Sequence, residues 1–138
     1  MTRSQISRQQ VSDKNRIQHT AALFGIHYPL NIEPAVYSIT SNIASEYNGA
    51  YWVFYSLSNG GFYMAPFSDK DYQISCDNGF EGKLSADALG ITACLYAYSH
   101  LSFTANPTFA DICSNHYQWL REYMFEHVEA SAILKAID

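Results

Sequence analysis

The stretch from residue 51 to residue 66, YWVFYSLSNGGFYMAP, is the part of the chain that most restricts its fold. It places an Asn-Gly-Gly between two runs rich in aromatic and other large apolar residues. This pattern is typical of a β-hairpin, because the Asn-Gly pair tolerates the backbone conformation of a tight turn. The chain is therefore expected to contain an antiparallel sheet.

The turn of this hairpin is predicted at Asn59, Gly60 and Gly61. A two-residue turn at Asn59-Gly60 pairs Leu57 with Phe62, and directly opposed residues share a face. One face then carries the more apolar set, Val53, Tyr55, Leu57, Phe62 and Met64. The other carries Trp52, Phe54, Ser56, Tyr63 and Ala65. We expect the first face to form the core, and a strand at 72–76 to extend the same sheet.

Helical spacing of apolar residues predicts five further segments. The first two cover about 14–24 and 32–47, and the second of these is capped by Asn31. The third runs from a cap at Ser85 to about residue 101, the fourth begins at a capping box at Thr108, and the fifth covers about 128–137. Helices before and after a hairpin-linked sheet indicate an α+β fold. The predicted architecture is a single domain with a small antiparallel sheet of about three strands packed against four or five helices.

The charge is distributed unevenly along the chain. Residues 1–12 are polar without apolar periodicity, which predicts a flexible N-terminal arm before a single domain at 13–138. Residues 17–138 contain four basic and twelve acidic residues, a net charge of −8. Such a body repels nucleic acid, so no direct DNA binding is expected unless the arm provides it. The same charge is too sparse to imitate DNA, which carries one charge per about 1.7 Å of axis.

The longest apolar stretch and the cysteines indicate where the protein is located and whether it binds a metal. The longest apolar stretch, 88–103, is interrupted and shorter than the roughly 20 residues of a membrane span, and no signal segment precedes it. We expect no membrane contact and a cytoplasmic protein. Cys76, Cys94 and Cys113 have no spacing typical of disulfides or zinc sites, so they are expected to be buried thiols. No metal or cofactor is predicted.

The chain contains none of the common catalytic motifs, and no catalytic residue is predicted. Candidate contacts with a partner are Trp52 and Tyr63, with Tyr51 as a weaker one, since rigid aromatic anchors dominate binding energy when a partner buries them. Core packing is the alternative role for all three. An acidic helical face is predicted from the spacing of Glu122, Glu126 and Glu129. It is either a solvated face or a patch that meets a basic surface.

Four long segments of the sequence are recognisable. They are RIQHTAALFG, YNGAYWVFYSLSNGGFYMAP, GFEGKLSADALGITACLYAYSHLSF and HVEASAILKAID. Over residues 14 to 138 the chain resembles the antirestriction family of ArdB and KlcA proteins. The resemblance implies an α+β domain carried on bacterial plasmids or mobile islands that relieves type I restriction without acting as an acidic DNA mimic. It implies no catalytic residue. One departure is His127-Val128 where the family pattern has His-Pro, which affects how sharply the last helix begins.

Two hypotheses of function follow. The first is a non-enzymatic inhibitor that contacts a protein of the restriction-modification system, with the subunit undefined and a homodimer left open. The second is an enzyme of unknown reaction that acts on the restriction machinery through Asp87, Cys94, His100 or His116. Loss of protection in a folded alanine variant of one of these four residues distinguishes the second from the first.

Overall fold

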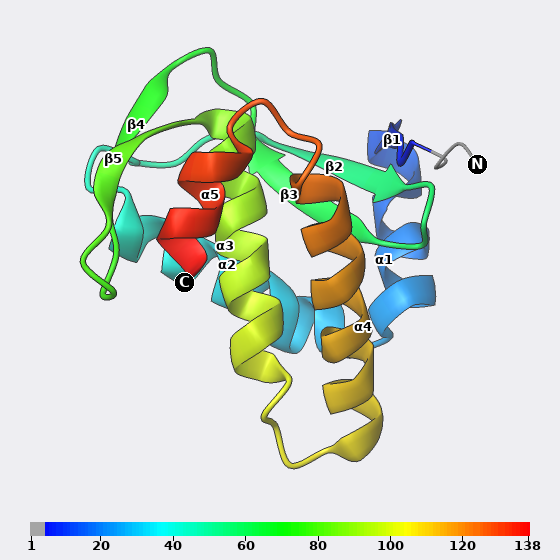
Figure 1. Cartoon of the computed structure of the whole chain (residues 1–138). Helices are drawn as coiled ribbons and strands as arrows, with labels where there is room; N and C mark the ends of the chain where they lie inside the picture. The colour runs from blue at the N-terminus through cyan, green and yellow to red at the C-terminus, as the bar shows by residue number, and fades with distance from the viewer. Residues whose placement is uncertain (1–4) are drawn as a thin grey trace.

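A computed structural model describes residues 5–138 as a single α+β domain (Figure 1). The strands are β1 (Arg8–Val11), β2 (Trp52–Leu57), β3 (Phe62–Pro66), β4 (Asp71–Ser75) and β5 (Glu81–Ser85). The α-helices are α1 (Arg16–Phe24), α2 (Glu33–Ile43), α3 (Ala86–Leu101), α4 (Pro107–Met124) and α5 (Ala130–Ile137). Two short turns of other helix types are η1 (Asp13–Asn15) and η2 (Tyr28–Ile32). The predicted fold class is confirmed.

The main sheet has the strand order β1-β2-β3, and all its pairs are antiparallel. Strand β1 lies within the segment 1–12 that the sequence assigned to a flexible arm, so that prediction is wrong for residues 8–11. Strand β1 lies at the edge of the sheet, and its first three residues are exposed and polar. The sequence of β1 therefore lacks the apolar pattern from which a strand is predicted. Residues 1–4 of the predicted arm lie outside the described residues.

The hairpin is shifted by one residue from the predicted register. Tyr55 pairs with Tyr63, and the Leu57 N–H donates to the Gly61 carbonyl at 2.9 Å. The turn therefore has three residues, Ser58, Asn59 and Gly60, with Gly60 at a φ of 101°. Three-residue hairpin turns use the same Asn-Gly signal as two-residue turns, with the glycine in the left-handed region. A one-residue shift exchanges the faces of one strand relative to the other.

Both faces of the hairpin are buried. On one face Phe54 and Phe62 contact Tyr28 of η2, with ring centroids 6.0 and 6.3 Å apart. On the other face Tyr63 packs against Tyr123 of α4, and Ala65 lies against Gly90 of α3. The sheet thus lies between α1 and η2 on one side and α3 and α4 on the other, and the single core face predicted from the sequence is wrong.

Helix α3 runs through the centre of the molecule (Figure 1). The predicted cap at Ser85 is confirmed, since its hydroxyl accepts a hydrogen bond from the Ala88 N–H at 3.2 Å. The Tyr98 hydroxyl donates to the Phe62 carbonyl at 2.7 Å, and the Cys94 thiol donates to the Met64 carbonyl at 3.6 Å. Side chains of α3 therefore cover the outer edge of β3, which would otherwise present unpaired carbonyl groups.

Other boundaries differ from the prediction. Strand β4 pairs with β5 in a separate two-stranded sheet and not with the hairpin. Helix α2 follows η2, and the Asn31 side chain lies against His27 instead of capping a helix. Helix α4 is capped by Asn106, whose side chain accepts from the Phe109 N–H at 3.0 Å, and not by Thr108. Among residues 5–138, no helix has the length and apolar character needed to cross a membrane.

Candidate functional site

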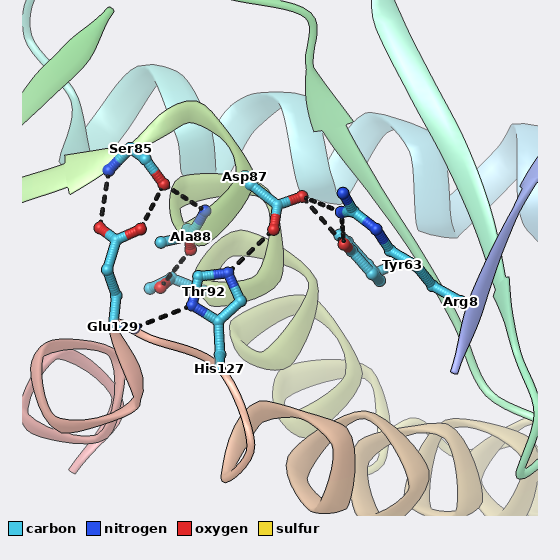
Figure 2. Close-up of polar contacts among 8 residues, drawn as sticks. All are labelled: Arg8, Tyr63, Ser85, Asp87, Ala88, Thr92, His127 and Glu129. Carbon is cyan, nitrogen blue, oxygen red and sulfur yellow. Dashed lines mark hydrogen bonds and ion pairs between the residues drawn. The ribbon is translucent and has the colours of Figure 1, made fainter. Parts of the chain in front are cut away.

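Four polar side chains from four parts of the chain meet beside the N-terminus of α3 (Figure 2). We call Arg8, Tyr63, Asp87 and His127 the Asp87 cluster. Arg8 Nη1 donates to Asp87 Oδ1 at 2.8 Å and to the Tyr63 hydroxyl at 2.6 Å. The Tyr63 hydroxyl donates to the same carboxylate oxygen at 2.9 Å. His127 Nε2 lies 2.9 Å from Asp87 Oδ2. The cluster thus joins β1, β3, α3 and the turn before α5.

The hydrogen bonds define the tautomer of His127. Its Nδ1 accepts from the Glu129 backbone N–H at 3.0 Å, so this nitrogen carries no proton. The proton of the neutral ring is therefore on Nε2, which donates to Asp87. Both ring nitrogens are occupied within the fold. His127 consequently has no lone pair with which to accept a proton from a substrate.

The charges of the cluster favour an ionised Asp87. Burial raises the pKa of the Asp87 carboxyl, but the hydrogen bond from His127 and the charge of Arg8 outweigh it and lower this pKa below its ordinary value. Burial, followed by the charge of Asp87, raises the pKa of the Tyr63 hydroxyl, which stays protonated and acts as a donor. The cluster is an ionic network whose members bond to one another, and it holds β1, β3, α3 and the turn before α5 together.

A second network lies next to the Asp87 cluster (Figure 2). The Glu129 carboxylate accepts from both the backbone N–H and the hydroxyl of Ser85, at 2.9 and 2.5 Å. The same hydroxyl accepts from the Ala88 N–H. Glu129 therefore fixes the start of α3 from the opposite end of the chain. It is a structural residue, and its prediction as a member of a free acidic patch is wrong.

The largest of the cavities described among residues 5–138 is a surface groove of about 650 Å³ between α1, η2, α2 and β2. We call it the α1–η2 groove. Its lining is mainly apolar, with Arg16, Glu33 and the hydroxyls of two tyrosines as the main polar groups. The lining residues are Arg16, Ile17, Thr20, Ala21, Gly25, Ile26, Tyr28, Pro29, Glu33, Tyr37 and Phe54. Burial, with the charge of Glu33 adding to it, raises the pKa of Tyr37 to about 12, so this hydroxyl stays a donor.

The structure places the predicted aromatic contacts differently from the expectation. Trp52 is buried, and its Nε1 donates to the Tyr47 hydroxyl at 2.9 Å. Tyr63 is fully buried between Tyr55 and Tyr123. Neither side chain can contact a partner, because the helices on both faces of the sheet cover them. Tyr51 is half exposed, and its hydroxyl bonds to Asp13 and Arg16.

The remaining predicted site residues are two candidate contacts and the residues of the structural turn. Glu122 and Glu126 are exposed on α4 and the turn after it, as expected for a solvated or partner-binding face. The turn residues have a packing role. The Asn59 side chain donates to the Trp119 carbonyl at 2.9 Å and accepts from the Gly61 N–H at 3.1 Å. A side chain at Gly61 would meet Leu57 and Trp119 at 3.0 Å.

The residues proposed for an enzyme do not assemble into one site. Asp87 is bonded to His127 within the Asp87 cluster, whereas His100 is exposed near the end of α3. Burial raises the pKa of the Cys94 thiol to about 12, which makes it a poor nucleophile. His116 is buried among Phe24, Tyr98 and Trp119, and burial lowers its pKa to about 4. Within residues 5–138, no group of three or more His, Cys, Asp or Glu side chains is arranged to hold a metal ion.

Sequence reasoning missed the partners of Asp87. Arg8, Tyr63 and His127 are between 24 and 79 residues away from Asp87 along the chain, so no local motif joins them. The one available signal is the position of Asp87 in the first turn of a helix capped by Ser85, where a carboxylate is favourable. That signal does not identify partners from other elements.

The fold and these sites define a small α+β protein whose Asp87 cluster is bonded within the fold and whose largest described groove has a mainly apolar lining. A family model described as "Antirestriction protein" matches residues 45–138. The chain is 41% identical over 130 residues to the antirestriction protein KlcA of Escherichia coli, with 93% of this chain and 92% of KlcA covered. The chain belongs to this antirestriction family.

Two further similarities extend over almost the whole chain. The uncharacterized protein YafX of Escherichia coli strain K12 is 42% identical, with 93% of this chain and 85% of YafX covered. A solved structure matches with a TM-score of 0.91 and 38% identity, with all of both chains covered. It comes from work that describes the KlcA and ArdB proteins as having a novel fold and antirestriction activity against type I DNA restriction systems in vivo but not in vitro.

Proposed function

We propose that this chain relieves type I restriction of incoming plasmid or phage DNA by binding a protein of the restriction-modification system in the cytoplasm. The observation that carries the proposal is the 38% identity and full-length structural match to a protein with type I antirestriction activity in vivo. The charge distribution supports contact with a protein over contact with DNA. Arg8 and Arg16 are held in ion pairs with Asp87 and Asp13, and residues 17–138 carry a net charge of −8.

The test of this function is made in cells, since the matched relative acts in vivo but not in vitro. Unmodified phage is plated on bacteria that carry an active type I system, with and without the chain. We expect a higher plating efficiency with the chain, and no effect on phage already modified by the host. An affinity-tagged chain should also retain a subunit of the restriction enzyme. Unchanged plating would reject the function, and protection without any retained subunit would reject the mode of action.

An enzyme acting on the restriction machinery is the second candidate, favoured by the Asp87–His127 pair beside a cavity of about 430 Å³. The closed network argues against it, because each member of the pair is occupied within the fold. We expect Asp87→Asn to lower the free energy of unfolding by about 3 kcal/mol, as loss of one partner from a partly buried ion pair does. Protection should decline only in proportion to the folded fraction.

The enzyme candidate makes the opposite prediction for the same variant. Asp87→Asn would then abolish protection even when equal amounts of folded protein are compared. Asp111→Asn provides a control, because this carboxylate is exposed on α4 outside the cluster. Both variants are compared by urea unfolding and by phage plating at equal amounts of folded protein.

A further inference from the structure

We propose that the α1–η2 groove is the surface with which the chain binds its protein partner, and that the occupant is an amphipathic segment that brings apolar side chains and one Lys or Arg. This inference rests on the proposed function and adds the site and the chemistry of the contact. The groove is the largest cavity described, and its volume of about 650 Å³ can receive several side chains.

Two isoleucines extend the apolar surface beyond the cavity. Ile17 on α1 is 86% exposed and Ile26 in the loop before η2 is 65% exposed, and both line the groove. Large apolar side chains that gather beside a cavity indicate an interaction site, whereas scattered ones need no explanation. Because these two side chains line the groove and are still largely exposed to solvent, the surface fits a protein segment better than a small molecule enclosed by the groove.

The polar groups of the groove define the charge of the occupant. Arg16 is compensated by Asp13, whose carboxylate lies 3.3 Å from Arg16 Nη2. Glu33 accepts a hydrogen bond from the Tyr28 hydroxyl at 3.2 Å, but no Lys, Arg or His of residues 5–138 forms an ion pair with it. The groove therefore presents one uncompensated carboxylate within an apolar lining. A basic side chain complements it, and the net charge of −8 on residues 17–138 attracts such a partner.

The first experiment compares two equally exposed positions. Ile17→Asp places a charge in the groove, and Phe103→Asp places one in the α3–α4 loop, where Phe103 is also 86% exposed. We expect Ile17→Asp to lower phage protection by about 30-fold, the effect of losing a binding hot spot, and Phe103→Asp to leave it unchanged. Both variants should melt at the wild-type temperature because neither side chain is buried. Full protection by a folded Ile17→Asp variant would overturn the proposal.

A second pair of variants tests the charge. Glu33→Lys should reduce protection at least as much as Ile17→Asp, because it repels a basic side chain. Glu33→Gln keeps the acceptor for the Tyr28 hydroxyl and should reduce protection by only about 3-fold, as for an exposed ion pair of below 1 kcal/mol. Equal protection by Glu33→Lys and the wild type would overturn the basic occupant. Wild-type protein that gives no protection would instead reject the proposed function itself.

The identity of the occupant is tested by crosslinking in cells that carry the type I system. A photoreactive benzophenone amino acid is placed at position 17 and, as a control, at position 103. We expect a crosslink from position 17 to a peptide of a restriction subunit that contains apolar residues and a Lys or Arg, and none from position 103. A crosslink to a second copy of this chain, to nucleic acid or to a small molecule would overturn the proposal, as would no crosslink at position 17.

Discussion

Gly90 allows α3 to approach the sheet closely enough to cover its edge. A Cβ atom at this position would overlap Ala65 and the Met64 carbonyl, both of which belong to β3. The backbone of β3 cannot move away easily, because it is paired with β2 on its other side. The same close approach lets the Tyr98 hydroxyl and the Cys94 thiol reach the β3 carbonyls.

We therefore expect Gly90→Ala to destabilise the protein, although alanine favours a helix interior by about 1 kcal/mol over glycine. The overlap with backbone atoms should outweigh this gain and lower the free energy of unfolding by about 3 kcal/mol. Gly79→Ala is the control, with open space around Gly79 but a φ of 92°, and it should cost about 1 kcal/mol. Urea unfolding measures both. A Gly90→Ala variant more stable than the wild type would contradict the packing.

His116 makes stability depend on pH. Its Nδ1 has no hydrogen-bond partner among residues 5–138, and burial lowers its pKa from 6.5 to about 4. Between these two values the unfolded chain binds a proton that the folded chain does not. Stability is therefore complete above pH 6.5 and falls as the pH decreases towards 4, by at most about 3 kcal/mol at 1.36 kcal/mol per unit.

The corresponding variant is His116→Phe, which keeps a ring between Phe24 and Trp119 but cannot titrate. Its free energy of unfolding should change much less between pH 6.5 and pH 4.5 than that of the wild type. Chemical unfolding at several pH values provides the slopes. Asp87 does not produce the same effect, because its lowered pKa removes stability only at more acidic pH. Equal slopes for wild type and variant would contradict the role of His116.

At the scale of elements, β1 is held by alternating hydrogen bonds. The Ser7 carbonyl accepts from the Ser58 N–H at 2.9 Å, so the backbone groups of Ser7 face β2. The backbone groups of Gln9, two residues later, face the same way, while those of Gln10 face the open edge. Both glutamine side chains are exposed. The two positions therefore differ mainly in whether the backbone N–H is used within the sheet.

Proline substitutions at these two positions distinguish the contribution of a backbone N–H that faces β2 from that of a backbone N–H at the open edge. Gln9→Pro removes an N–H that faces β2, and we expect it to lower the free energy of unfolding by about 2 kcal/mol. Gln10→Pro removes an N–H at the edge and should cost less than 1 kcal/mol, since proline is tolerated there. Urea unfolding of both variants gives the difference. Similar costs at both positions would show that β1 is not paired in this register.

The elements of this fold were predicted with unequal success for physical reasons. Helix α3 was found because Ser85 gives a strong cap and its apolar residues extend around the whole helix. The hairpin was found, but its register was not, because Asn59-Gly60 fits turns of two or three residues. Apolar residues on both faces then gave no alternation to choose between them. Strand β1 was missed because its exposed side chains are polar.

The candidate sites were harder to predict than the fold. Trp52 and Tyr63 have the composition of binding anchors, but the packing of α3, α4 and η2 decides that they are buried. The Asp87 cluster depends on contacts between distant segments that no spacing along the chain encodes. Conversely, Glu129 was predicted on a free acidic face because its bond to Ser85, 44 residues away, cannot be inferred from helical periodicity.

At the scale of the whole molecule, the charge distribution determines which partners are favourable. Four of the eight basic residues occur in the first sixteen positions, and two of these, Arg8 and Arg16, are held in ion pairs of the fold. Glu122 and Glu126 are exposed on α4 and the turn after it. DNA affinity arises mainly from basic groups that neutralise phosphates and release counterions. The net charge of −8 on residues 17–138 opposes this step.

We therefore expect the purified chain to bind duplex DNA more weakly than about 10⁻⁴ M at physiological salt, below ordinary non-specific binding. Fluorescence anisotropy of a labelled duplex measures the affinity as salt is varied. A double variant, Glu122→Lys with Glu126→Lys, is the control, because it removes repulsion from one face and should bind measurably at low salt. Micromolar binding by the wild-type chain, weakening steeply with salt, would contradict the expectation and indicate that the basic N-terminal residues contact DNA.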